Sequence, residues 1–213
     1  LLDKKLLQLD KNARPLNIYI GNDLGFCGNF NTNVSTEARR DENCDKIIIG
    51  KKIIKNNQDG VLLAITKEEY KENIKEIERI LYDAITNRKN SEINVVYNHY
   101  FNISKIELTR KRLLPLPERS TDKKTYKEDF AVEGDINDIL INIIVLYLLY
   151  EIRIATENSF ASENIMRQAI TKESLKKIEE IEEENERMER KIRKNINFKK
   201  TLENFTNVNN KDG

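Results

Sequence analysis

The stretch from Asp135 to Phe205 constrains the fold of this chain more than any other feature. It contains neither glycine nor proline, so no residue in it is a strong helix breaker. Its first part, as far as Ala155, is apolar, and its second part is densely charged. A continuous helix of this length would be on the order of 100 Å long at about 1.5 Å per residue. Such a helix cannot bury itself against a small domain, so we expect it to be a shaft for a larger assembly.

One side of the charged part carries an apolar line. Its residues follow alternating spacings of three and four, which is typical of a coiled-coil seam. The seam consists of Ile178, Ile181, Asn185, Met188 and Ile192, with Asn185 as the polar interruption. Glutamate precedes arginine by four residues at 183/187, 186/190 and 189/193, which favours an exposed helix.

Charge and cysteine content exclude several classes of protein. Lys+Arg and Asp+Glu number 37 and 36, so net charge favours neither a nucleic-acid partner nor an acidic substrate. Cys27 and Cys44 are too few for a disulfide framework, which indicates a reducing intracellular compartment. The most apolar run, Ile139 to Tyr150, has 12 residues, and we expect a buried helix and no membrane span. The chain opens on Leu1, without a secretory segment, and we expect a further segment before it.

Residues 16–114 alternate between strand and helix patterns. We expect strands at 16–21, 46–49, 61–65, 93–100 and 104–114, and helices at 32–40 and 67–88. Thr66 can cap the second helix, and a single helical turn is expected at 51–55. Residues 118–129 read as a surface loop. These elements predict an α/β domain with an open sheet of about five strands over 16–130. Residues 1–15 would end an upstream helix or form a linker, and 131–213 would form the shaft and tail.

The candidates for chemistry are weak. Gly21, Gly25 and Gly28 follow a strand, but their spacing departs from the dinucleotide fingerprint, and Gly50 stands where the second strand should end in an acid. A tight turn explains these glycines better. His99 is the only histidine, and no ligand cluster surrounds it, so we expect neither a metal site nor a catalytic triad. The residues favour a non-enzymatic interaction protein without a cofactor.

Four motifs resemble those of one family. They occur in the order GNDLGFCGNFNTNV after the first strand, IIIGKK at the end of the second, RLLPLP at the end of the fifth and FASENIMR in the long helix. In this order and at similar distances they resemble the gamma subunit of F-type ATP synthases, over nearly the whole chain from Leu16. Leu24 replaces an arginine that is usual in the first motif.

The resemblance implies a fold and a role. The family has a small Rossmann-like domain that binds no nucleotide, flanked by terminal helices that pair in an antiparallel coiled coil. This shaft turns inside a hexamer of alpha and beta subunits and transmits torque, and its foot meets an epsilon-like subunit and a membrane ring. The chain would then be a peripheral, non-catalytic subunit on the cytoplasmic face of a membrane. The pairing helix would precede Leu1 or come from another chain.

The resemblance also carries over individual contact residues. Glu163 and Arg167 match the pair in the family's A-S-E-x-x-x-R segment, which implies contacts between shaft and hexamer. Arg193 falls on the arginine of the family's polar catch, where Lys194 replaces a glutamine and Phe198 a threonine. Phe130 and Glu133 align with the aromatic and acidic positions that meet the membrane ring.

Three other functions stay open on the sequence. An F-like ATPase shaft adapted to work other than ATP synthesis, for example cell motility, would preserve the same motifs. A cofactor-binding α/β enzyme built on the glycine-rich turn, or a free-standing coiled-coil adaptor with an α/β head, would not need them.

Overall fold

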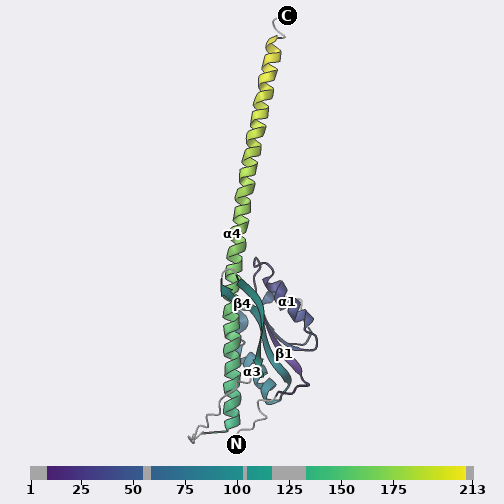
Figure 1. Ribbon diagram of the computed structural model, residues 1–213, viewed down its shortest axis with the longest axis vertical. Helices are drawn as coiled ribbons and strands as arrows, with labels where there is room; N and C mark the ends of the chain where they lie inside the picture. Colours follow the sequence, from purple (N-terminus) through teal and green to yellow (C-terminus); the bar gives the residue numbers. More distant parts are fainter. Residues whose placement is uncertain (1–8, 55–58, 103–104, 117–132, 210–213) are drawn as a thin grey trace. The chain divides into compact units, whose positions relative to one another are not determined.

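The computed structural model describes residues 9–54, 59–102, 105–116 and 133–209, and their side chains as far as residue 203. Five strands and four α-helices make up the described chain (Figure 1). The strands are β1 (Arg14–Ile20), β2 (Asp45–Ile49), β3 (Val61–Ile65), β4 (Asn90–Asn102) and β5 (Lys105–Leu114). The helices are α1 (Phe30–Arg40), α2 (Lys51–Ile54), α3 (Ile74–Thr86) and α4 (Ile136–Asn209), with a 3-10 turn at Glu69–Lys71.

The strands form one mixed sheet in the order β3-β2-β1-β4-β5. Strands β1, β2, β3 and β4 are parallel, whereas β5 returns antiparallel to β4. The chain leaves β1 towards β2 on one side and later returns to pair β4 on the other, so β1 lies at the point where the strand order reverses. The five-stranded α/β sheet with a long C-terminal helix that the sequence predicts is confirmed.

Both faces of the sheet are covered. On one face, α3 and the first part of α4 pack against the apolar side chains of the strands, including the fully buried Leu16, Ile47 and Ile93. On the other face, Val34 and Ala38 of α1 and Ile53 of α2 pack against Tyr19, Ile48 and Val96. Helices α1 and α4 lie on opposite sides of the sheet (Figure 1). Coverage on both faces explains why the parallel strands are apolar runs without clean alternation.

The chain divides into two compact units, Leu1–Arg167 and Gln168–Gly213. In the first unit, α4 places one side in the same core as the sheet, through Ile141, Ile144, Val145, Leu148, Ile152 and Ala155. In the second unit, every described side chain from residue 171 to 203 is exposed. The division therefore falls inside α4, whereas the boundary expected near residue 130 lies outside the described residues.

The apolar part of α4 is longer than the 12-residue run from Ile139 to Tyr150. An 18-residue window within it reaches a mean hydropathy of 1.9, which by length and composition would suffice to cross a membrane. The 12 residues from Ile139 to Tyr150 therefore underestimate the length of the apolar stretch. In the structure 39% of that window is buried, and Leu148 and Ile152 are fully buried against the sheet. Packing on the sheet thus accounts for the apolar residues on that side of α4.

One local expectation was also wrong. The helix expected over 67–88 is divided at Asn73, whose φ of −97° and ψ of 8° are not helical, so a 3-10 turn precedes α3. Thr66 does cap this segment, since its Oγ1 accepts the Glu69 amide at 3.2 Å and Glu69 Oε2 accepts the Thr66 amide at 2.8 Å. Residues 11–13 form a turn and a bend, and β1 begins at Arg14. Residues 1–8 lie outside the described residues, so the helix end or linker expected over 1–15 stays a prediction.

Candidate functional site

Polar side chains meet at the carboxyl edge of the parallel strands, where doubly wound proteins bind their ligands. Asp23, in the loop after β1, accepts the backbone amide of Lys51 at 2.7 Å and that of Lys67 at 3.0 Å. Lys51 follows β2 and Lys67 follows β3, so a single carboxylate joins the ends of three strands. The first two sequence motifs are therefore brought together by Asp23.

The loops after β1 and β2 pack closely against each other at Gly21 and Gly50. Gly50 has a φ of +125°, and a Cβ at this position would lie 2.6 Å from the carbonyl carbon of Gly21. The amide of Asn22 donates to Asn31 Oδ1 at 2.9 Å, and that of Lys52 donates to the Asn22 carbonyl at 3.0 Å. These two backbone amides are thus already bonded within the protein and do not face a phosphate. This geometry disfavours the cofactor-binding enzyme.

Helix α4 contributes a buried carboxylate to this edge. Glu163 is 4% exposed; its Oε2 accepts Lys67 Nζ at 3.2 Å, and its Oε1 accepts Arg167 Nη2. The hydrogen-bond network orients the Asn22 amide so that its nitrogen donates to Glu163 Oε2 at 2.8 Å. We call Asn22, Asp23, Lys67, Glu163 and Arg167 the clamp, because they tie α4 to the strand ends. A carboxylate buried this deeply requires such partners.

Two apolar side chains next to the clamp are exposed to solvent. Leu24 and Phe26, in the loop after β1, are 63% and 85% exposed, and Phe26 has a φ of +58°. Two hydrogen bonds hold the backbone of this loop. Asn31 Nδ2 donates to the Leu24 carbonyl at 3.3 Å, and Arg167 Nη2 donates to the Gly25 carbonyl at 3.5 Å. An anchored loop with exposed apolar residues is typical of a protein-binding surface.

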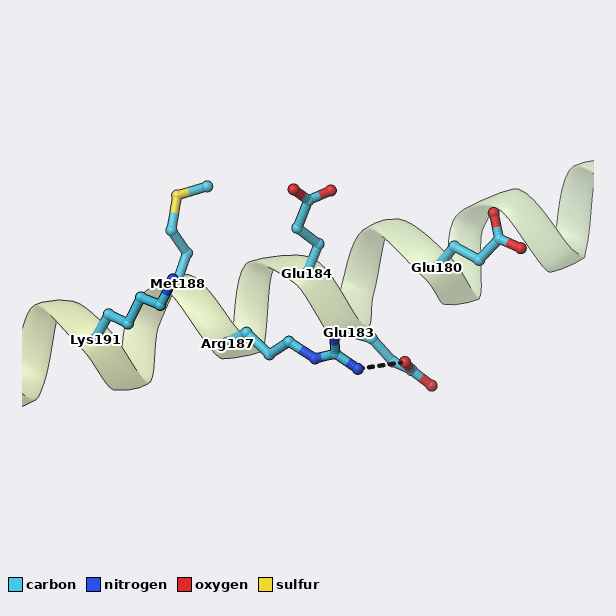
Figure 2. A pocket seen from close by; sticks show the side chains of 6 residues that line it. All are labelled: Glu180, Glu183, Glu184, Arg187, Met188 and Lys191. Carbon is cyan, nitrogen blue, oxygen red and sulfur yellow. Dashed lines mark ion pairs between the residues drawn. The ribbon is translucent and has the colours of Figure 1, made fainter.

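The predicted seam lies on the surface of the second unit. Ile178, Ile181, Met188 and Ile192 are 51–57% exposed, and Asn185 is exposed between them. The expected pairs 183/187, 186/190 and 189/193 are formed, at 3.6, 3.0 and 3.8 Å. Figure 2 shows Met188 among Glu180, Glu183, Glu184, Arg187 and Lys191, all from one helix, so this surface is open and not an enclosed pocket.

The other residues predicted to contact partner subunits lie outside the clamp, apart from Glu163 and Arg167. Arg193 and Lys194 are exposed on the second unit, and Arg193 pairs with Glu189. Glu133 is exposed just before α4, whereas Phe130 lies outside the described residues. Of the pair on α4, Glu163 is buried in the clamp and only Arg167, with its side chain 29% exposed, faces outward. All of these contacts stay predictions.

The other reactive residues have structural surroundings. His99 Nδ1 lies 3.0 Å from Tyr97 Oη, and the His99 ring meets the Phe101 ring edge-on with the centroids 4.4 Å apart. Burial raises the pKa of the Cys27 thiol, and the nearby Glu163 raises it further. Within the described ranges, no group of three His, Cys, Asp or Glu side chains could hold a metal ion.

Five members of this site were not predicted from the sequence: Asn22, Asp23, Leu24, Phe26 and Lys67. One signal was available, because Asn22, Asp23 and Lys67 each follow closely after a parallel strand, and parallel strand ends meet at one edge. The exposure of Leu24 and Phe26 had no signal in the sequence pattern.

Comparison with known proteins gives a consistent result. The family model described as ATP synthase matches residues 2–196. The ATP synthase gamma chain of Clostridium perfringens is 30% identical over 173 residues, which cover 76% of this chain and 60% of the relative. That of Clostridium novyi is 34% identical over 168 residues, covering 72% and 58%. The chain thus matches only about three fifths of the length of these curated relatives.

Solved structures share the fold. The rotor of the Euglena gracilis mitochondrial ATP synthase matches with a TM-score of 0.61 at 17% identity, covering 91% of this chain and 82% of that one. The central stalk and c-ring structure of the Tetrahymena thermophila mitochondrial ATP synthase matches with a TM-score of 0.56 at 21% identity, covering 76% of each chain.

Proposed function

This chain belongs to the gamma-chain family of ATP synthases, and from that premise we propose that it is the central rotor shaft of an F-type ATP synthase. In this role it transmits torque between a hexamer of alpha and beta subunits and the foot of the stalk. It carries no active site of its own, and ATP is made or hydrolysed on the partner subunits.

The observation that carries the proposal is the contrast between the two parts of α4. From residue 171 to 203 the described side chains are all exposed, and a line of large apolar residues runs among them. An exposed helix of this length gains no stability from a core of its own, and its apolar line requires a partner. A second helix along the seam, from a segment before Leu1 or from another chain, would form the antiparallel coiled coil. The hexamer would enclose that coiled coil.

The first unit would lie outside the hexamer. On the side of α4 away from the sheet, Ile143, Leu146 and Tyr150 are 54–58% exposed, and we assign this line to a partner helix and not to lipid. The chain would thus be peripheral to the membrane, on its cytoplasmic face. Glu133, together with Phe130, would meet the membrane ring and an epsilon-like subunit at the foot.

The clamp fits the transmission of torque. Glu163 joins α4 to the loops after β1 and β3 through charged hydrogen bonds, which are stronger than neutral ones. The α/β sheet domain would therefore turn together with α4. Arg167, Leu24 and Phe26 lie on the outer side of the clamp, where a beta subunit would contact them, whereas Glu163 acts through Arg167.

Coexpression with the alpha and beta subunits of the same organism tests the proposal. The full-length protein should co-purify with them and support ATP hydrolysis. Because Cys27 and Cys44 are buried, a cysteine at exposed Lys52 would attach a bead to the head specifically. ATP should then drive rotation of the bead. A chain that never enters the complex, or a bead that stays still while ATP is hydrolysed, would refute the shaft.

The seam can be tested in the same assembly. Ile181→Asp places a charge in the seam and should reduce assembly at least about tenfold, since a buried unpaired charge costs more than 1.4 kcal/mol. Asn197→Asp makes the same change in charge on the opposite side of the helix and is the matched control. Equal assembly of both variants would contradict this placement of the seam.

A further inference from the structure

A row of polar side chains crosses the sheet on the face that α1 covers. Lys46 of β2, Asn17 of β1 and Asn94 of β4 are direct neighbours in the strand register. Two residues further along these strands, Ile48, Tyr19 and Val96 form the core against α1. Asn17 and Asn94 are 2% exposed, so their side-chain amides need partners inside the protein. Lys46 is 5% exposed, but its ammonium nitrogen is not one of the buried polar atoms without a partner in the described chain, so it reaches solvent.

The two asparagines have their partners. Asn94 Nδ2 donates to Asn17 Oδ1 at 2.9 Å, and Asn17 Nδ2 donates to Asp41 Oδ2 at 3.1 Å. Asp41 Oδ2 also accepts the Tyr19 hydroxyl, and it accepts Arg110 Nη2 at 2.5 Å. Oδ2 of the Asp41 carboxylate therefore accepts three donors, from Asn17, Tyr19 and Arg110, at the end of this chain of hydrogen bonds.

Lys46 is the exception in the row. Within the described chain its ammonium group forms neither an ion pair nor a hydrogen bond; its stem is buried, and the ammonium group opens into a pocket. A lysine arranged in this way keeps its charge in solvent, where an anion can reach it. The side chain of Lys46 lines this pocket at the amino ends of β1 and β2. The other lining residues are Arg14, Arg39, Asp41, Glu42, Asn43, Cys44, Asp59 and Gly60.

The wall of this pocket is fixed by close packing. Gly60 has a φ of +70°, and a Cβ there would lie 2.2 Å from the Cys44 carbonyl oxygen. The Lys46 amide donates to the Gly60 carbonyl at 2.7 Å, which holds the turn against β2. Burial raises the pKa of the Cys44 thiol, although Lys46 opposes this shift. The thiol is therefore neutral at pH 7 and does not balance the charge of Lys46.

The acids of the pocket do not balance it either. Asp41 is engaged by Arg110, and Glu42 and Asp59 are exposed on the rim without an ion pair to Lys46. Arg14 and Arg39 add two exposed cations. We propose that this pocket binds a phosphate group, with the ammonium group of Lys46 at its base and Arg14 and Arg39 at the entrance. The group could be free phosphate or a phospholipid headgroup, which share this chemistry.

Thermal unfolding of the full-length protein in phosphate, against chloride of equal ionic strength, tests the site. At a phosphate concentration about 100 times Kd, a single site raises Tm by about 5 °C or more. Lys46→Met should abolish this rise, and Lys46→Arg should retain it. Without phosphate, Lys46→Met should not lower Tm, because Lys46 has no partner to lose among the described residues. Lys52→Met, at an exposed lysine of α2, is the matched control and should respond like the wild type.

Vesicles separate the two sources. If phosphate alone raises Tm through Lys46, the ligand is a free phosphate. If only phosphatidylglycerol vesicles bind in a sedimentation assay, and Lys46→Met but not Lys52→Met prevents it, the ligand is a headgroup. Arg39→Gln should weaken whichever response occurs, and this variant changes only an exposed side chain. Equal responses of the wild type and Lys46→Met to both probes, including no response, would overturn the proposal. The outcome does not depend on assembly with the hexamer.

Discussion

The two parts of α4 lie in opposite environments. In the first unit, Leu148 and Ile152 are fully buried against the sheet. In the second unit, Ile181 and Ile192 are 57% and 53% exposed, and the described side chains around them are charged. The first part is held by tertiary packing, whereas the second has only helix propensity and i,i+4 pairs, which contribute about 0.2–0.5 kcal/mol each.

This difference in burial indicates that the two parts of α4 have different roles. The part that packs on the sheet anchors the shaft, and its stability belongs to the chain itself. The exposed part keeps its apolar line for a partner, so its stability belongs to the assembly. The clamp, with Glu163 and Arg167, lies at the end of the anchored part, immediately before the division at Arg167 and Gln168. The predictions below separate these two contributions.

Truncation of isoleucine should have very different effects in the two parts. Ile152→Ala removes a fully buried side chain and should lower the free energy of unfolding by about 2–5 kcal/mol. Ile181→Ala changes the same side chain at an exposed position of the same helix and should stay within about 0.5 kcal/mol. Urea unfolding of the isolated full-length protein measures both. Similar values for the two variants would show that the second unit has a core of its own.

Neutralising the buried carboxylate of the clamp should have the next largest effect. Glu163→Gln leaves the charges of Lys67 and Arg167 without their shared partner. We expect a loss of about 2 kcal/mol, below the usual cost of breaking a buried pair because these two side chains are 20% and 29% exposed. Hydrogen exchange should also increase in the loops after β1 and β3.

Glu173→Gln is the matched control, because it breaks the exposed pair with Lys177 at 2.7 Å on the same helix. It should leave unfolding unchanged, since exposed ion pairs contribute little. If both variants unfold like the wild type, Glu163 does not tie α4 to the head.

The sequence predicted the elements well for physical reasons that differ between them. Strands β2 and β3 are short apolar runs ended by glycine or a cap, and their bounds agree with the expected ones within one residue. The start of α4 agrees equally well, because Gly134 precedes it and nothing inside it breaks a helix. Local patterns suffice where local residues decide the structure.

The clamp could not be predicted in the same way. Asp23 and Lys67 are 44 residues apart, and Lys67 and Glu163 are 96 apart. Periodicity identifies Glu163 as one more polar residue on a helix, and only the order of the strands brings Lys67 beside it. The motif resemblance marked Glu163 and Arg167, but it implied an outward contact for both, whereas burial gives Glu163 an internal one.

The smallest expected effect is a change with alkaline pH in the free energy of unfolding of the first unit. Burial, and then the hydrogen bond to Asp41, raise the pKa of Tyr19 in the folded protein. The resulting stability is present below the unfolded pKa of about 10 and is lost as pH rises towards the folded value. Tyr19→Phe removes this hydrogen bond and should cost about 1 kcal/mol at neutral pH. The difference from the wild type should shrink as pH rises above about 10, because the wild type then loses the same contribution.

The raised pKa values of the two buried thiols act in the same direction but are common to both proteins, so they cancel in this difference. Tyr82→Phe, at a tyrosine of α3 that is 39% exposed, is the matched control. The effect belongs to the first unit alone, since the described side chains from 171 to 203 are exposed and bury no titratable group. Urea unfolding between about pH 7 and 11 measures it. A difference between Tyr19→Phe and the wild type that stays constant with pH would place the Tyr19 hydroxyl outside the buried network, and Asp41 would then be held by Asn17 and Arg110 only.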